Sequence, residues 1–230
     1  MDELERRKLD SLKELAYGAS HEINNPLANI AARAQALLRD EPHPDRRRTL
    51  EAIHQQALRA HEMISDLMLF ARPPQPVFES LDLNELVAEI ANGIGAEAEH
   101  RRIELTITLP NQATIIRGDR QQLWIAVRAV GDNALEAVGT DGKVALTVSI
   151  LGDMAQIELA DTGPGISPEI REHLFDPFFS GREAGRGLGF GLSKCWRIVT
   201  EHGGSISVAS HTGPGAVFSI ALPISGPRAQ

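Results

Sequence analysis

Ser20-His-Glu-Ile-Asn-Asn-Pro-Leu27 lies within a stretch of the chain whose apolar residues recur at steps of three and four. Steps of this kind place the apolar side chains on one stripe of an α-helix. His21 lies two positions from both Ala19 and Ile23, so at about 3.6 residues per turn it is expected to point away from the stripe. The stripe is formed by Leu12, Ala16, Ala19, Ile23, Leu27, Ile30, Ala34 and Leu37.

A second helix of the same kind follows a turn. The segment Arg39-Asp-Glu-Pro-His-Pro-Asp45 contains two prolines, which end a helix and redirect the chain. The apolar residues beyond it follow the heptad pattern: Leu50, Ile53, Ala57, Ala60, Ile64, Leu67 and Ala71. Residues 1–72 are therefore predicted to be a helical hairpin. A lone hairpin leaves apolar surface in water, so we expect two copies to form a four-helix bundle.

The remainder of the chain predicts a second domain of a different class. Arg72-Pro-Pro-Gln-Pro76 is rich in proline, so residues 73–80 are predicted to be a stiff linker. Residues 81–225 then mix strands and helices. Helices are expected at 83–99, 121–138, 168–174 and 192–202, and strands at 103–109, 114–117, 144–151, 155–160, 205–209 and 216–222. The fold class is therefore α+β, with one mixed sheet covered by helices on one face, a two-layer α/β sandwich.

Composition and charge exclude several classes of protein. The 230 residues are 42% hydrophobic and 23% charged, as in ordinary globular proteins. The net charge of −8 disfavours binding to nucleic acid or to an anionic membrane surface. The single cysteine, Cys195, cannot form an intrachain disulfide, and no run of about 18 apolar residues exists. We therefore expect no nucleic-acid partner and no membrane contact within this chain.

His21 is the first candidate for chemistry. A neutral imidazole can act as a nucleophile near neutral pH, and Glu22 beside it could accept a ring proton. Asn25 lies four residues on and hence on the same helical face. Pro26 costs about 3 kcal/mol inside a helix, which suggests that the helix bends there. The alternative is an ordinary solvated or core histidine, which is the commoner situation for a histidine on a helix.

Two candidates for ligand binding lie in the second domain. Asn133, in a predicted helix, could hold a divalent cation through its amide oxygen, although most helical asparagines are merely solvated. Asp161-Thr-Gly-Pro-Gly-Ile166 follows a predicted strand, and its glycines allow a ligand to approach the backbone. Asp161 could accept a hydrogen bond from an exocyclic amine. A plain turn is the alternative, because aspartate, glycine and proline all favour turns.

A glycine-rich loop precedes the predicted helix that begins near Leu192. Such a loop favours phosphate binding, because the backbone amides at a helix start are free and the helix dipole attracts anions. A flexible linker is the competing interpretation. Phenylalanines could anchor one end of the loop and leave the glycines as hinges of a lid. The residues concerned are Phe175, Phe178 and Phe179, followed by Gly185, Gly187, Gly189 and Gly191.

Together these segments resemble the sequence boxes of sensor histidine kinases. His21-Glu-Ile-Asn-Asn-Pro-Leu27 resembles the phosphoacceptor box of the dimerisation domain. The boxes of the ATP-binding domain are matched by Asp132-Asn-Ala-Leu-Glu-Ala137 (N box), Asp161-Thr-Gly-Pro-Gly165 (first glycine box), Phe175-Asp-Pro-Phe-Phe179 (F box), Gly187-Leu-Gly-Phe-Gly-Leu192 (second glycine box) and Gly213-Pro-Gly215 (final box). Their order and spacing agree with the family, and the resemblance covers residues 10–224.

The resemblance implies a role for each residue. His21 would be the phosphoacceptor, Glu22 its acid/base partner, and Asn25 the residue that orients water when the response regulator is dephosphorylated. Asn133 would ligate Mg²⁺ on the phosphates of ATP, and Asp161 would bind the adenine amino group. The other residues implied in ATP binding are Gly163 and Gly165 in the adenine pocket, and Phe178, Arg182, Gly187, Gly189, Gly191 and Leu192 around the lid and phosphates.

The resemblance also implies a Bergerat-type ATP-binding fold, a homodimer, ATP and Mg²⁺ as cofactors, and the receiver domain of a response regulator as partner. The location would be cytoplasmic, either as a whole protein or as the cytoplasmic part of a longer sensor. The activity would be phosphorylation of His21 and transfer to an aspartate, with dephosphorylation of the regulator as a further activity. One alternative is an ATPase of the gyrase or chaperone kind, which His21 and its box disfavour. The other is a catalytically weak pseudokinase scaffold, which Ala129 and Ala216 slightly favour because relatives carry polar residues there.

Overall fold

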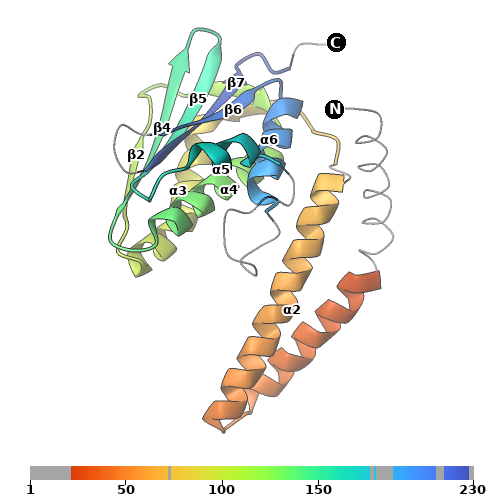
Figure 1. The fold of residues 1–230 in the computed structure, drawn as a ribbon. Coiled ribbons are helices and arrows are strands. Elements are labelled where there is room, and N and C mark those ends of the chain that lie inside the picture. Colours follow the sequence, from red (N-terminus) through yellow and green to blue (C-terminus); the bar gives the residue numbers. More distant parts are fainter. Residues whose placement is uncertain (1–21, 72–73, 177–178, 180–188, 211–214, 228–230) are drawn as a thin grey trace. The chain divides into compact units, whose positions relative to one another are not determined.

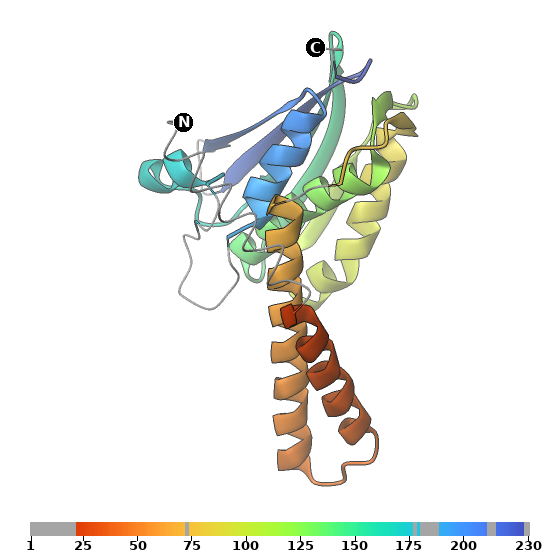
Figure 2. The same ribbon diagram turned by 90° about the vertical axis from the view of Figure 1, so that its right-hand side faces the viewer.

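The computed structural model describes residues 22–71, 74–176, 179, 189–210 and 215–227. The chain divides into two compact units, Met1–Pro74 and Gln75–Gln230. Both units are shown in Figure 1 and, turned by 90°, in Figure 2. None of the described helices has the combination of length and apolar composition needed to cross a membrane.

The first unit is a helical hairpin. Residues 22–39 are helical, and α2 spans Pro44–Ala71. Pro44 is the first residue of α2, a position where the missing N–H of proline costs no helical hydrogen bond. The two helices meet through small side chains, Ala31, Ala34 and Ala57, which are buried. The ring atom Nδ1 of His54 on α2 lies 3.0 Å from the Ala31 carbonyl oxygen, which joins the two helices.

Four of the larger residues of the predicted apolar stripes remain largely in solvent. Ile23, Ile30, Leu37 and Ile53 are between 40% and 61% exposed in the single chain. Contact between the two helices therefore buries the alanines and leaves the isoleucines and the leucine uncovered. An exposed apolar face of this kind is what one half of a helical bundle presents to the other half.

The second unit is a two-layer α/β sandwich, as the sequence predicts. Its sheet has the strand order β2-β4-β5-β7-β6. The strands are β2 (Glu104–Thr108), β4 (Lys143–Leu151), β5 (Met154–Asp161), β6 (Ser205–Ser210) and β7 (Ala216–Pro223). Three helices, α3 (Leu83–His100), α4 (Arg120–Val138) and α6 (Gly191–Glu201), cover one face of the sheet, and the short α5 (Pro168–His173) follows β5 (Figures 1 and 2).

The core lies between these helices and the sheet. Side chains alternate between buried and partly exposed along β4, β5 and β7, because successive residues of a strand point to opposite faces. The buried positions of α3 and α4 recur at helical spacing. The side chains completely removed from solvent include Leu86, Ile90, Ile94, Leu123, Leu146, Ile157, Leu159, Phe218 and Ile220.

The prediction of a single sheet was wrong for residues 114–117. The strand there, β3 (Ile115–Gly118), pairs antiparallel with β1 (Glu79–Asp82) in a separate two-stranded sheet. Glu-Ser-Leu-Asp has little strand character of its own, so β1 escaped prediction, and β3 was left without its true partner. Glu79 and Ser80 therefore belong to a strand although they fall within the segment 73–80, which the sequence predicts to be linker.

Candidate functional site

The predicted phosphoacceptor, His21, lies outside the described residues. Glu22 and Asn25 are placed, and both are exposed on the first turns of the helical residues 22–39. The helix continues through Pro26, and the Asn25 carbonyl oxygen accepts a hydrogen bond from Asn29 Nδ2 at 3.1 Å. The side chains of Glu22 and Asn25 are therefore accessible to a partner molecule.

Asp161 is the last residue of β5 and is buried, with 4% of its surface exposed. Its atom Oδ1 accepts a hydrogen bond from the Gly163 amide at 2.8 Å. The other oxygen, Oδ2, is buried and has no hydrogen-bond partner among the described residues. Burial raises the pKa of Asp161 above its ordinary value, and the amides of Gly163 and Ala216 only partly oppose this rise. A buried acceptor without a partner is costly, and a ligand that donates a hydrogen bond would relieve that cost.

Three glycines bring the backbone close around Asp161. A Cβ on Gly163 would lie 2.9 Å from the Ala137 carbonyl group, at the end of α4. Gly165 has a φ of +79° and packs against Gly215, and a Cβ on Gly215 would collide with the Asp161 carbonyl oxygen. The segment is thus a closely packed loop that only glycine permits at these points. Gly215 matches the final box in sequence but is not among the residues that the resemblance implies in ATP binding; its match to that box was the available signal.

Asn133 lies on α4 and is partly buried. It precedes by about one helical turn the Ala137 carbonyl that meets Gly163. The neighbours of Asn133 on either side are occupied by other interactions: Asp132 pairs with Arg128 at 2.8 Å, and Ala134 is buried in the core. The structure thus brings Asn133 and Asp161 into one region, where α4 meets the loop after β5.

The second glycine box leads into α6. Gly189 has a φ of +72°, Phe190 is buried, and α6 begins at Gly191. No side chain of the described residues caps this helix start. Ser193 Oγ donates instead to the Phe190 carbonyl oxygen at 3.1 Å, and Leu192 packs against the core. Phe178, Arg182 and Gly187 lie outside the described residues.

Comparison with known proteins accounts for both units. Residues 11–76 match the family model described as His Kinase A (phospho-acceptor) domain. Residues 118–226 match the model described as Histidine kinase-, DNA gyrase B-, and HSP90-like ATPase, which identifies a nucleotide-binding domain. The first match contains His21, and the second contains Asn133, Asp161 and the glycine loops.

Curated relatives match nearly the whole chain. Sensor histidine kinase ZraS of Escherichia coli (strain K12) is 32% identical over 225 residues, which are 97% of this chain and 48% of that protein. Signal transduction histidine-protein kinase AtoS of the same strain is 32% identical over 218 residues, which are 94% of this chain and 36% of that protein. The chain thus spans about half the length, or less, of these relatives.

Solved structures of histidine kinases are also similar to this chain. The mycobacterial sensor histidine kinase MprB is 30% identical with a TM-score of 0.55, and the match covers 66% of this chain and all of that one. Histidine kinase ThkA, in complex with response regulator protein TrrA, is 25% identical with a TM-score of 0.71, covering 96% of this chain and 64% of that chain. With both domain types present in this order, and with these relatives, the chain belongs to the family of sensor histidine kinases.

Proposed function

We propose that this chain is the catalytic portion of an ATP-dependent protein-histidine kinase. It phosphorylates its own His21 and transfers the phosphoryl group to an aspartate in the receiver domain of a response regulator. The observation that carries the proposal is the buried Oδ2 of Asp161, which has no partner in the described part of the chain and lies at a glycine loop of a domain matched to an ATPase family. Membership of the sensor histidine kinase family supports the phosphorylation of His21 and the transfer to a response regulator.

The residues around Asp161 fit an adenine nucleotide. The Gly163 amide holds Oδ1, so Oδ2 is left to accept a hydrogen bond from the exocyclic amino group of adenine. The uncapped start of α6 and the positive φ of Gly189 suit the phosphates. The full proposed ATP-binding set is Asn133, Asp161, Gly163, Gly165, Phe178, Arg182, Gly187, Gly189, Gly191 and Leu192.

Asn133 is proposed to ligate Mg²⁺ through its amide oxygen. Mg²⁺ is a hard cation that binds few protein ligands and completes its shell with phosphate oxygens and water. When bound, it neutralises charge on the phosphates during transfer. The position of Asn133 on α4, one turn before the contact with the Asp161 loop, supports this role.

His21 is the proposed nucleophile. A ring nitrogen of His21 forms a bond to the γ-phosphorus as the bond to the ADP oxygen breaks, and the ring proton passes to Glu22. In the second step an aspartate oxygen of the receiver domain takes the phosphoryl group and the nitrogen–phosphorus bond breaks. Asn25, exposed and one turn from His21, is proposed to orient water for hydrolysis of the resulting acyl phosphate.

The proposed assembly is a homodimer through the helical hairpins. Exposed Ile23, Ile30, Leu37 and Ile53 form the apolar face that a second hairpin would cover. The proposed division of the chain is residues 1–72 for dimerisation and phosphotransfer, 73–80 as linker and 81–225 for ATP binding. The relative ThkA, solved with a response regulator, supports the receiver domain as partner.

Incubation with γ-labelled ATP tests the function. Label on the protein that is stable to base and labile to acid indicates phosphohistidine. His21→Ala should abolish it and leave ATP binding intact, while His61→Ala, which changes an exposed histidine of α2, should label normally. Wild-type labelling of His21→Ala would contradict the assigned nucleophile. Release of phosphate with no protein label would indicate an ATPase, and binding without either reaction would indicate a pseudokinase scaffold.

A further inference from the structure

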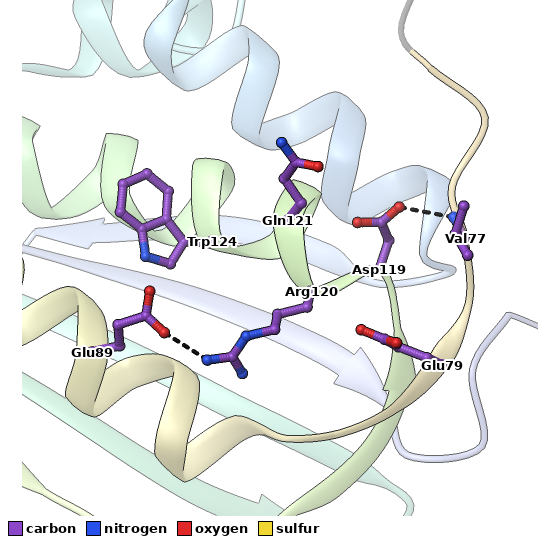
Figure 3. A pocket seen from close by; sticks show the side chains of 7 residues that line it. All are labelled: Val77, Glu79, Glu89, Asp119, Arg120, Gln121 and Trp124. Carbon is purple, nitrogen blue, oxygen red and sulfur yellow. Dashed lines mark hydrogen bonds and ion pairs between the residues drawn. The ribbon is translucent and has the colours of Figure 1, made fainter.

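The segment that enters the second unit is held by one carboxylate. The Val77 amide donates a hydrogen bond to Asp119 Oδ2 at 2.8 Å, and Figure 3 shows the carboxylate directed at that amide. Val77 itself is 73% exposed, so its side chain contributes little burial. Next to it, the Phe78 ring packs on the His202 ring with centroids 5.1 Å apart. We name the hydrogen bond between Val77 and Asp119 the linker anchor.

Asp119 is itself fixed to two helices. Its Oδ1 accepts from the Gln122 amide at 3.0 Å and so caps the start of α4. Its own amide donates to His202 Nε2 at 2.9 Å, and His202 Nδ1 lies 2.8 Å from the Ile198 carbonyl oxygen near the end of α6. A carbonyl can only accept, so Nδ1 carries the proton and His202 is neutral. His202 is 2% exposed, so its hydrogen bond with the Asp119 amide is shielded from water.

The anchored point stands at the end of a stiff connection. Helix α2 ends at Ala71, and the residues from there to Val77 include Pro73, Pro74 and Pro76. Proline restricts its own backbone and that of the residue before it, so the described residues 74–76 have few accessible conformations. A stiff segment transmits orientation only from a point at which it is fixed. The linker anchor provides such a fixed point on the ATP-binding unit.

We propose that Asp119 is a positioning residue for phosphoryl transfer: through the linker anchor it sets the direction in which the proline linker leaves the ATP-binding unit. This rests on the function proposed above, in which nucleotide and His21 lie on different units and must meet. Asn133 is about 21 Å from Asp119 along α4 by helix rise, so the anchor is remote from the nucleotide residues. Its loss should change transfer to His21 and spare the affinity for ATP.

Val77→Pro tests the proposal because it removes the donated N–H and leaves Asp119 in place. Val77→Ala is the matched control, since it trims the same exposed side chain and keeps the amide. We expect both variants of the full chain to bind ATP within twofold of each other and to melt at similar temperatures. The initial rate of His21 labelling at saturating ATP should be at least fivefold lower in Val77→Pro. Asp119→Ser, which keeps a cap for Gln122 and is too short to reach Val77, should behave likewise.

A second measurement does not depend on activity. Cysteines placed at exposed Glu51 on α2 and Asp153 between β4 and β5 can carry spin labels, since the native Cys195 is buried. Val77→Pro should broaden the distribution of distances between the labels relative to Val77→Ala. Equal rates and equal distributions in the two variants would overturn the proposal, as would a loss of ATP affinity and thermal stability in parallel with the rate. If the wild type acquires no phosphoryl label at His21, the proposed function alone is refuted. The distances between the spin labels would still test whether the linker anchor orients the connection.

Discussion

Substitution of Asp161 by asparagine separates the binding role of this residue from its role in the fold. The change preserves shape, and the amide oxygen of asparagine can still accept the hydrogen bond from the Gly163 amide. What changes is the buried Oδ2 position, where a hydrogen-bond acceptor becomes an NH₂ donor. An adenine amino group would then face another donor.

The expected loss of affinity follows from one hydrogen bond. A hydrogen bond to a charged group contributes about 1.5–3 kcal/mol, which corresponds to a loss of about tenfold to a hundredfold in ATP affinity. The stability of the protein without ATP should not fall in the same way. Burial raises the pKa of Asp161, so the fold favours the protonated carboxyl. That contribution is present below the unfolded value of 3.8 and is lost as pH rises through the raised folded pKa. At neutral pH the charge therefore costs stability, and asparagine should melt no lower than wild type.

Calorimetric titration with ATP and thermal melting, both near neutral pH, measure the two quantities. The melting temperature of wild type should rise with added ATP, and that of Asp161→Asn should rise much less. Asp153→Asn is the matched control, because Asp153 is exposed in the turn between β4 and β5, at the opposite end of β5 from Asp161, and this variant should bind ATP normally. Unchanged affinity in Asp161→Asn would refute the assigned pocket. A markedly lower melting temperature without ATP would show that the carboxylate is mainly structural.

Three other perturbations give distinct outcomes. Burial lowers the pKa of His202, so the contribution of this residue to stability is complete above pH 6.5 and declines as pH falls below that value. His202→Gln keeps an amide oxygen that can accept from the Asp119 amide, and it should flatten the dependence of melting temperature on pH. An unaltered slope would contradict this. Gly215→Ala should lower both melting temperature and ATP affinity because its Cβ meets the Asp161 carbonyl, whereas Gly95→Ala in an open position of α3 should not. Asn25→Ala should slow dephosphorylation of the regulator and largely spare His21 labelling; a parallel loss of both activities with a lower melting temperature would instead indicate a helix-stabilising role.

The elements with strong periodicity were predictable from sequence. The heptad spacing in α2 predicts a helix, and the alternation in β4 and β5 also records which face is buried, because each period belongs to one type of backbone. Strand β1 carries no such pattern and exists because β3 lies beside it. Of the candidate site, Asp161 and Asn133 were identified by type and spacing. The need for glycine at 215 arises from contact with a carbonyl more than fifty positions earlier in the chain.

The sequence by itself determined the family, the two domain types and the residues whose side chains can take part in catalysis or binding, since these depend on residue type and local spacing. The tertiary structure decided which groups are buried and paired. Among the residues that the structure describes, Asp161 Oδ2 has no partner, while both oxygens of Asp119 have one and the Asp119 amide is bonded to His202. Asp119 and His202 are 83 positions apart, and nothing in their local sequences indicates the contact. Burial and pairing depend on what the fold places around a group, and that information is not contained in any short segment of the chain.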